Sequence, residues 1–214
     1  MARHLSFSLL LTGALLAAGC GGSTQQADEE PVEPMTAPLP VAGLASQKVA
    51  LYPITMVVAE RRLDWAELLG TREEALQMAD SMIAEFLIER VPEADWVMPD
   101  ELRRLARQAP GILPDPDRMG NALLREEFIT QVPDPLRSQL RNLTGVAGDR
   151  YAVIPSALGF FATEEEGIAR AELHVVVVDV RKGFVEWRTK ATGEGDDPGD
   201  ALWEALRGLV PGMP

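Results

Sequence analysis

Hydrophobic and polar positions follow two different periods in the second quarter of the chain. Apolar side chains crowd the stretch KVALYPITMVV at residues 48–58, which predicts a first strand in which Pro53 marks a bulge or an edge. Thr71 and Glu74 then have the spacing of a capping box, in which a hydroxyl and a carboxylate satisfy free N–H groups at a helix start. Apolar residues recur behind them every three or four positions, so we expect a helix that ends just before Pro92.

The middle of the chain predicts short elements joined by loops. We expect a short strand at residues 95–98 and a short helix at 101–108. The proline- and aspartate-rich stretch GILPDPD at 111–117 is typical of a loop. Two further stretches, 118–131 and 134–143, have the apolar spacing of helices.

The last third of the chain predicts three strands in succession. The stretch RYAVIPSALGFF at 150–161 predicts a strand in which Pro155 indicates a bulge. The stretch 168–180 contains the run HVVVVDV, and a tight turn follows at 181–183. A last strand is expected at 184–195, so that the three strands form an antiparallel meander.

The last two strands differ in the faces that they show. Residues 174–180 are apolar on both faces, which is typical of a central strand covered by helices on both sides. In the final strand, alternation predicts one wet face, with Val185, Trp187 and Thr189 on one side and Glu186, Arg188 and Lys190 on the other. Asp197 and Pro198 are typical of the cap and first position of a closing helix. The order predicts an α/β (α+β) fold: a mixed sheet of about five strands with a C-terminal antiparallel meander, and helices packed on the sheet.

The first nineteen residues have the order of a secretory signal peptide. Arg3 gives a basic start, and the apolar stretch at 5–18 is shorter than the roughly 20 residues that a membrane span needs. Small residues precede Cys20, which is the only cysteine of the chain. The sequence LAAGC at 16–20 resembles the lipoprotein box of bacterial lipoproteins.

This resemblance implies cleavage between Gly19 and Cys20, a diacylglyceryl group on the thiol and an acyl chain on the freed amine. Several acyl chains hold a protein firmly at a membrane, at about 0.8 kcal/mol per buried methylene. Gly21 stands where an aspartate would retain such a protein at the inner membrane, so the outer membrane is favoured, with the domain on the periplasmic side. The alternatives are a buried core cysteine and a secreted protein with a spare thiol.

Composition separates a tether from a single domain. Residues 20–45 contain four prolines and the acidic run Asp28–Glu30 but few large apolar side chains, which predicts a flexible tether behind the lipidated cysteine. Residues 46–214 have the length of one domain. The formal net charge of -13 repels phosphate backbones, so nucleic acid is disfavoured as a partner.

From residue 46 to about residue 210, the order of motifs resembles a known group of envelope domains. A KVALYPI-like first strand is followed by a long helix, by ADWVMPDELRRL, by DRYAVIP and by the hairpin VVDVRKGFVEW. This order is similar to the α/β fold of the TolB amino-terminal domain, which the curli-secretion lipoprotein and a lipoprotein activator of penicillin-binding proteins share. The resemblance implies a periplasmic assembly or interaction module rather than an enzyme.

Few side chains offer catalytic chemistry once the signal peptide is removed. His174 is then the only histidine, and we interpret it as a structural or surface residue rather than as a general base beside Glu172. Asp179 lies in an apolar run just before the turn, where we expect it to cap that turn or to pair with Arg181 or Lys182. No cysteine–histidine set has metal-ligand spacing, and no nucleotide-binding motif occurs.

Two acidic stretches have a composition that could hold a cation. Residues 115–117 and 193–197 both lack the spacing of a calcium loop, so a proline-rich turn and a helix cap are the simpler interpretations. The sequence therefore predicts no catalytic residue, no metal and no cofactor.

The tryptophans are the remaining candidates for a binding surface. Trp65 lies in the loop between the first strand and the first long helix, so it is the candidate for an exposed partner contact. Trp187 and Trp203 are expected in the core. The sequence thus predicts a lipid-anchored, non-enzymatic periplasmic module that binds another envelope protein. The alternative is a carboxylate-based enzyme or small-ligand binder that acts on envelope material.

Overall fold

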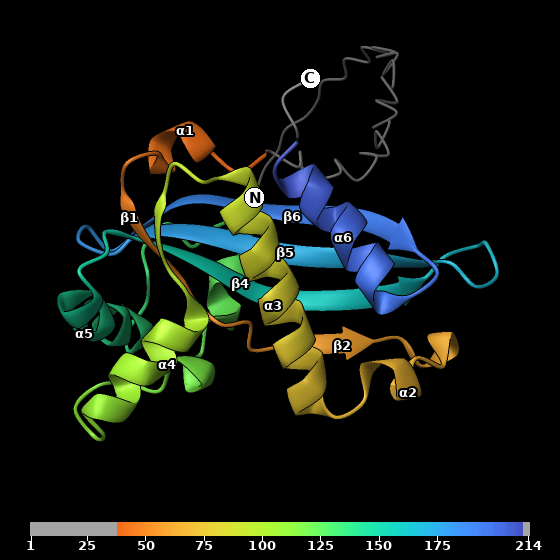
Figure 1. Cartoon of the computed structure of the whole chain (residues 1–214), viewed down its shortest axis with the longest axis horizontal. Coiled ribbons are helices and arrows are strands. Elements are labelled where there is room, and N and C mark those ends of the chain that lie inside the picture. The colour runs from red at the N-terminus through yellow and green to blue at the C-terminus, as the bar shows by residue number, and fades with distance from the viewer. Residues whose placement is uncertain (1–37, 212–214) are drawn as a thin grey trace, which may run out of the picture. The chain divides into compact units, whose positions relative to one another are not determined.

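The structure, a computed structural model, describes residues 38–211 (Figure 1). The expected cleavage site at Gly19 and Cys20 and most of the expected tether lie outside the described residues. None of the described helices is long and apolar enough to cross a membrane.

A six-stranded mixed sheet carries the other elements. Its strands are β1 (Lys48–Leu51), β2 (Val57–Ala59), β3 (Asp95–Val97), β4 (Tyr151–Ala162), β5 (Ala169–Asp179) and β6 (Phe184–Gly195). They lie in the order β3-β1-β4-β5-β6, and β2 pairs with β4 further along that strand. β1 is parallel to both of its neighbours, whereas β4, β5 and β6 form the predicted antiparallel meander. The register of β4 shifts between Pro155 and Ala157, so the expected bulge is confirmed together with the α/β fold.

The helices begin and end at residues that the local sequence favours. They are α1 (Val41–Leu44), α2 (Ala66–Leu69), α3 (Arg72–Arg90), α4 (Pro99–Gln108), α5 (Leu136–Ala147) and α6 (Pro198–Leu209), with 3-10 turns η1 (Arg61–Leu63), η2 (Pro116–Arg118) and η3 (Ala122–Arg125). The hydroxyl of Thr71 accepts the N–H of Glu74 at 3.2 Å, and the Glu74 carboxylate accepts the N–H of Thr71 at 2.7 Å. Asp197 likewise accepts the N–H of Asp200 at 2.9 Å. Both predicted caps are confirmed.

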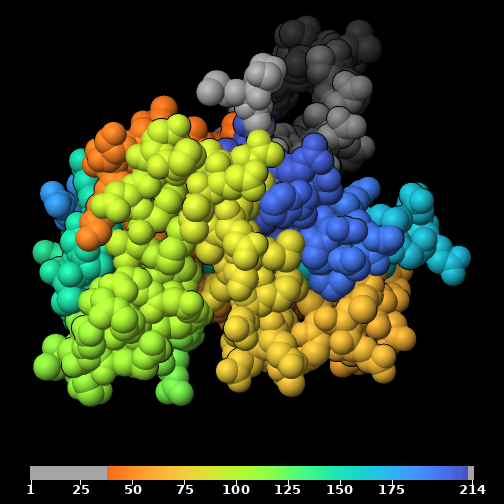
Figure 2. All heavy atoms as spheres, in the orientation of Figure 1, coloured from red at the N-terminus to blue at the C-terminus, as the bar shows by residue number. Residues whose placement is uncertain are grey.

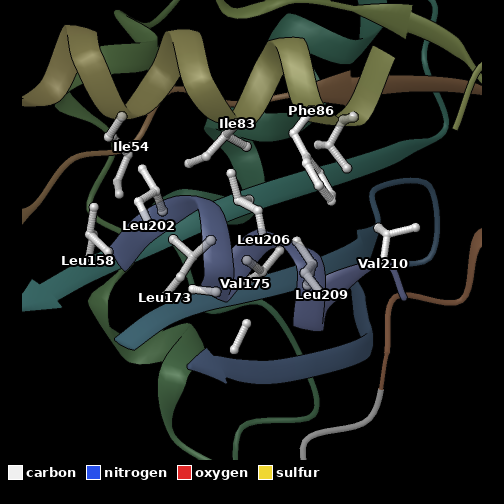
Figure 3. Packing of buried hydrophobic residues seen from close by; sticks show 14 of the residues in the cluster. Ile54, Ile83, Phe86, Leu158, Leu173, Val175, Leu202, Leu206, Leu209 and Val210 are labelled. Carbon is white, nitrogen blue, oxygen red and sulfur yellow. The ribbon is translucent and has the colours of Figure 1, made fainter. Parts of the chain in front are cut away.

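α3 and α6 lie side by side across one face of the sheet (Figure 1). Ile83 and Phe86 of α3 lie in one buried cluster with Leu202 and Leu206 of α6 and with strand side chains such as Leu173 (Figure 3). All five are at most 1 % exposed, and burying each such side chain contributes about 1.5–3 kcal/mol. This face therefore holds the first of two cores.

α4 and α5 form the second core on the opposite face of the sheet. Leu102 of α4 and Leu140 of α5 are buried with Ile154 of β4. The irregular segment 119–132 extends this cover through buried apolar side chains. Further along the strands the same face becomes polar and partly exposed, as at Lys190, which confirms that β6 has a wet side.

The predicted first strand is divided in two. β1 ends at Leu51 and β2 begins at Val57, with Pro53 in the segment between them. Pro53 has no N–H to give to a sheet, and Ile54 donates its N–H to the Asp80 carboxylate at 2.7 Å instead of to a strand. The interruption is therefore wider than the expected bulge.

The helix predicted at 118–131 is wrong. Apart from η2 and η3 at its beginning and middle, this stretch is irregular. The carbonyl groups of Leu124, Glu127 and Ile129 all accept N–H groups of the Arg188 guanidinium on β6, the first two at 3.1 and 2.8 Å. One distant side chain thus satisfies carbonyls that helical N–H groups would otherwise bind.

The prediction of which side chains of β6 share a face of the sheet is also wrong at the beginning of that strand. Val177 pairs with Trp187 but Val178 pairs with Val185, so Glu186 is the extra residue of a bulge. An extra residue reverses the alternation of side chains. Val185 therefore packs on the second core, whereas Trp187 packs on the first.

The folded part begins earlier than residue 46. Leu39 and Leu44 are 4 % and 2 % exposed and belong to the first core. The N–H of Leu39 also donates to the carbonyl of Leu209 at 2.9 Å, which ties this segment to the end of α6. Residues 38–45 are therefore part of the domain, and the boundary expected at residue 45 is too late.

Candidate functional site

A groove lies between α3 and α4, outside the carboxyl ends of β1 and β3. α3 packs on one face of the sheet and α4 on the other, and such divergence leaves a crevice in open α/β sheets. The groove encloses about 760 Å³, a volume in the range of known ligand sites. Figure 2 shows this hollow between the yellow atoms of α3 and the yellow-green atoms of α4.

Arg103 of α4 gathers three aspartates at the floor and rim of the groove. Its guanidinium donates to Asp80 of α3, to Asp117 of η2 at 2.8 and 3.0 Å, and to Asp100 of its own helix at 3.0 Å. Asp80 is 6 % exposed, and its second oxygen accepts the N–H of Ile54. The network therefore joins α3, α4, η2 and the segment between β1 and β2.

The charges of this network hold one another in place. Burial raises the pKa of Asp80 by more than the N–H of Ile54 and the guanidinium of Arg103 lower it. The pKa of Arg103 is raised, first by its hydrogen bonds to Asp117 and then by Asp80. With three carboxylates around it, this guanidinium has no free charge to offer an anionic ligand.

The remaining lining of the groove is acidic and partly apolar. Six carboxylates and three guanidinium groups line it, which gives a formal charge of -3. Arg72 donates to the carbonyl of Thr55 at 2.8 Å, and Arg118 lies 3.5 Å from Asp115. Ile88 of α3 is 52 % exposed beside these groups. The surface that faces a ligand thus combines negative charge with an accessible aliphatic side chain.

The acidic stretches predicted from the sequence have local roles. Asp115 accepts the N–H of Asp117 at 3.1 Å and so caps η2, while Asp117 also binds Arg103. In the second stretch, carboxylate oxygens of Asp196, Asp197 and Asp200 lie within 4.8 Å of one another. Asp197 is the helix cap that the sequence predicts, and its charge raises the pKa of Asp200.

Asp179 caps the turn as expected but has a partner that the sequence did not indicate. The carboxylate is fully buried, and it accepts the N–H of Lys182 at 3.0 Å. Its ion pair with Lys182 is 3.6 Å long, and the guanidinium of Arg150 is closer, at 3.0 Å. Burial raises the pKa of Asp179, but these partners outweigh it and the net pKa is lowered.

The expected exposure of Trp65 is wrong. Its side chain is 7 % exposed and packs edge-on against Phe160 of β4, with ring centres 5.4 Å apart. The loop that carries it folds back onto the sheet, so the ring belongs to the first core. Trp187 is half-buried against that core as expected, whereas Trp203 is 37 % exposed with one edge against Phe86.

Sequence reasoning missed Asp80 and Arg103, the two central residues of the groove. The only local signal was the position of Asp80 on the buried stripe of α3, between Ala79 and Ile83. A carboxylate at such a position needs a partner from elsewhere in the fold. His174, the one histidine among the described residues, lies outside the groove and is half-buried on the second face of the sheet.

The chain matches no protein-family model and no curated protein sequence. Among solved structures, it is similar to the LpoB C-terminal domain from Escherichia coli at 12 % identity and a TM-score of 0.42, covering 71 % of this chain and 90 % of that chain. A PelC dodecamer from Paraburkholderia phytofirmans matches at 14 % identity and 0.36, covering 83 % and 94 %. Lipoprotein GNA1162 from Neisseria meningitidis matches at 12 % identity and 0.37, covering 70 % and 83 %. At these values, the likenesses assign no functional residue to this chain.

Proposed function

We propose that this chain is a lipid-anchored, non-enzymatic module on the periplasmic side of the bacterial outer membrane, and that its α3–α4 groove binds an envelope protein. The anchor rests on the signal-peptide pattern and the lipoprotein-box sequence that ends at Cys20. The observation that supports binding most directly is the groove itself, a hollow of about 760 Å³ whose central arginine is held by three carboxylates.

The occupant of the groove is a basic, amphipathic segment of the partner protein. The formal charge of -3 on the lining is complementary to lysine or arginine side chains, and exposed Ile88 offers apolar contact to the same segment. Attraction between exposed charges weakens as salt is added, because counter-ions screen it over about 10 Å at 0.1 M. Binding is therefore expected to weaken at high ionic strength.

A carboxylate-based enzyme is the second candidate function. It is favoured by the raised pKa of Asp80, which shares Arg103 with a second carboxylate, Asp117. A general base needs an oxygen within hydrogen-bond reach of the substrate. In this structure one oxygen of Asp80 accepts the N–H of Ile54 and the other accepts Arg103, so the geometry supports a structural role better.

Site-specific crosslinking in envelopes tests the groove. A photo-crosslinking residue placed at exposed Gln77, which lines the groove, is expected to give a crosslinked product, whereas one at exposed Thr192 on β6 is not. Glu73→Lys with Glu85→Lys reverses two lining charges and should remove the product. Mass spectrometry of the joined peptide should show a lysine- or arginine-rich segment. A product that is equal at both positions, or an acidic joined peptide, would contradict the proposal.

The enzymatic alternative has its own readout. Asp117→Asn keeps an acceptor for Arg103 but removes a titratable carboxylate. A carboxylate-based hydrolase would lose turnover of isolated envelope material in this variant. The binding module has no such turnover to lose, and only its crosslinking from Gln77 would change.

The anchor is tested by Cys20→Ser. We expect this variant to move from the membrane fraction to the soluble fraction, because the acyl chains have no thiol to attach to. A fractionation pattern equal to that of the unchanged chain would contradict lipid anchoring.

The tether is tested by two deletions. We propose that residues 20–37 are a tether, so a chain that lacks 21–37 is expected to keep its melting temperature. A chain that lacks 21–45 also loses buried Leu39 and Leu44, whose truncation to alanine alone would cost about 2–5 kcal/mol each. A melting temperature that falls equally in both deletions would contradict the proposed boundary.

A further inference from the structure

A second pocket, of about 290 Å³, lies on the sheet face away from α3 and α6, and we call it the cationic pocket. Its basic lining residues are Arg125, His174, Arg188 and Lys190, and Glu127 is its one acidic lining residue. A chain with a formal net charge of -13 thus concentrates positive charge at one place. The cationic pocket shares no lining residue with the α3–α4 groove, so its positive charge is a separate feature of the surface.

The register of the sheet brings these side chains together. His174 on β5 pairs directly with Lys190 on β6, so both point to the same face. Arg188 stands two residues before Lys190 and shares that face. Arg125 comes from η3, which lies over this end of the sheet and is tied to it by a bond from Arg125 to the carbonyl of Ser156 at 3.3 Å.

The two arginines of the pocket are not neutralised by acids. Arg188 donates to three backbone carbonyls and Arg125 to one, and a carbonyl group carries no net charge. Among residues 38–211, no carboxylate lies within 4.0 Å of either guanidinium. Both positive charges therefore remain available to an anion.

Lys190 is only partly neutralised. Its ammonium group lies 3.3 Å from Glu172, but the same carboxylate lies 3.3 Å from Arg170. One negative charge is thus shared between two cations. The side chain of Lys190 is 30 % exposed, so it can turn toward a ligand in the pocket.

His174 lies among these cations. Burial lowers its pKa, and the charges of Arg125 and Lys190 lower it further, while Glu172 acts weakly in the opposite direction. An anion in the pocket would cancel part of this repulsion and favour the protonated imidazole. The pKa of His174 therefore depends on the charges around it and should rise when an anion binds.

We infer that the cationic pocket binds a phosphate group, either as the free ion or as a phosphate ester. The two guanidinium groups and the ammonium group carry three positive charges, of which Glu127 offsets one and Glu172, shared with Arg170, offsets part of another. The charge that remains is positive and is carried by groups that bind the several oxygens of a phosphate. The volume of about 290 Å³ holds such an ion with several waters but leaves little room for a large ligand.

The imidazole of His174 provides a direct test in the full chain. The sequence contains two histidines, His4 and His174, and a His174→Gln variant assigns their ring signals in NMR spectra. Inorganic phosphate, added at ionic strength held constant with sodium chloride, is expected to move the His174 signals in a saturable way and to raise the pKa of His174. Sodium chloride alone should do neither.

Matched variants tie the effect to the pocket. Arg125→Gln and Lys190→Gln are each expected to weaken phosphate binding about tenfold, the loss expected when one charge-assisted hydrogen bond is removed. Arg207→Gln on α6, which lies on the other face, should change it less than about twofold. Thermal melts check that all three variants are folded. Weaker phosphate binding in either pocket variant is enough to support the inference.

Glycerol 3-phosphate distinguishes the two sources of phosphate. Saturable binding of inorganic phosphate alone supports a site for the free ion, and binding of both compounds supports a site for phosphate esters. The inference is overturned when phosphate moves the His174 signals no further than sodium chloride does. It is also overturned when neither Arg125→Gln nor Lys190→Gln weakens binding.

Discussion

The α3–α4 groove and the cationic pocket are each organised by one arginine, yet they have opposite charge. In the groove, Arg103 donates to three carboxylates, so the arginine is more than neutralised and the lining is negative. In the pocket, Arg188 donates to three backbone carbonyls, which satisfy its N–H groups but leave its charge. The acceptors that hold an arginine therefore decide whether its charge is still available to a ligand.

Both arginines also hold parts of the fold that are far apart in sequence. Arg103 joins α4 to Asp80, 23 residues away, and Arg188 joins β6 to Leu124, 64 residues away. The consequences of losing them should differ, because a carboxylate buried in the protein interior cannot regain water as easily as a carbonyl in a surface segment can.

Replacing Arg103 is expected to cause the largest loss of stability. Arg103→Ala leaves the buried carboxylate of Asp80 without its counter-charge, so the free energy of unfolding should fall by about 4 kcal/mol in urea denaturation. Arg104→Ala, on the same helix, removes only an exposed pair with Glu101 and should cost less than about 0.5 kcal/mol. Equal losses in the two variants would contradict the anchoring role of Arg103.

Replacing Arg188 is expected to cost less, about 2 kcal/mol in the same measurement, since water can replace the guanidinium at the released carbonyls. The effect should be local: amide hydrogens of residues 122–132 should exchange faster, including that of Val132, which donates to the carbonyl of Gly183. Arg188→Lys should not restore protection, because one ammonium group cannot reach all three carbonyls. Unchanged exchange in this segment would show that Arg188 does not hold it.

These two arginines also mark what could be predicted from the sequence and what could not. The capping box at Thr71, the cap at Asp197 and the meander were predictable, because each depends on residues close in sequence or on a regular alternation. Periodicity alone predicted a helix at 118–131, and the bonds from Arg188 override it. The partner of Asp80 was equally hidden, since no local pattern specifies a contact across 23 residues.

The facing of β6 shows a second kind of limit. Strict alternation placed Val185 and Trp187 on one face, but the extra residue Glu186 moves them to opposite faces. A bulge is set by how two strands fit together, and the sequence of one strand does not show it. For the same reason, the cross-strand neighbours of His174 could not be identified before the register was known.

Acidification is expected to affect the two sites in opposite directions. The pKa of Asp80 is raised above its ordinary value of 3.8, so the native state takes up a proton at a higher pH than the unfolded state does. The contribution of Asp80 to stability therefore grows as the pH falls through the native pKa toward 3.8. The pKa of His174 is lowered below 6.5, so the unfolded state takes up protons first and stability is lost as the pH falls below 6.5.

Two variants separate these contributions in denaturation experiments at a series of pH values from 7 to 4. Asp80→Asn should lose more stability on acidification than the unchanged chain does, whereas His174→Gln should lose less. The charged groups around His174 are Arg125, Arg188, Lys190, Glu127 and Glu172. If both variants lost more stability on acidification than the unchanged chain, or both lost less, the predicted difference between the two sites would be wrong.

The smallest expected effect concerns the balance of charge inside the cationic pocket. Glu127 is exposed, and its negative charge opposes a bound anion while its carbonyl holds Arg188. Glu127→Gln keeps that carbonyl and removes the charge, so inorganic phosphate should bind about twofold more tightly with no measurable change in stability. Glu164→Gln, in the exposed turn between β4 and β5, serves as the control and should leave the titration of His174 with phosphate unchanged. Weaker binding in Glu127→Gln would mean that this side chain acts as a ligand rather than as an opposing charge.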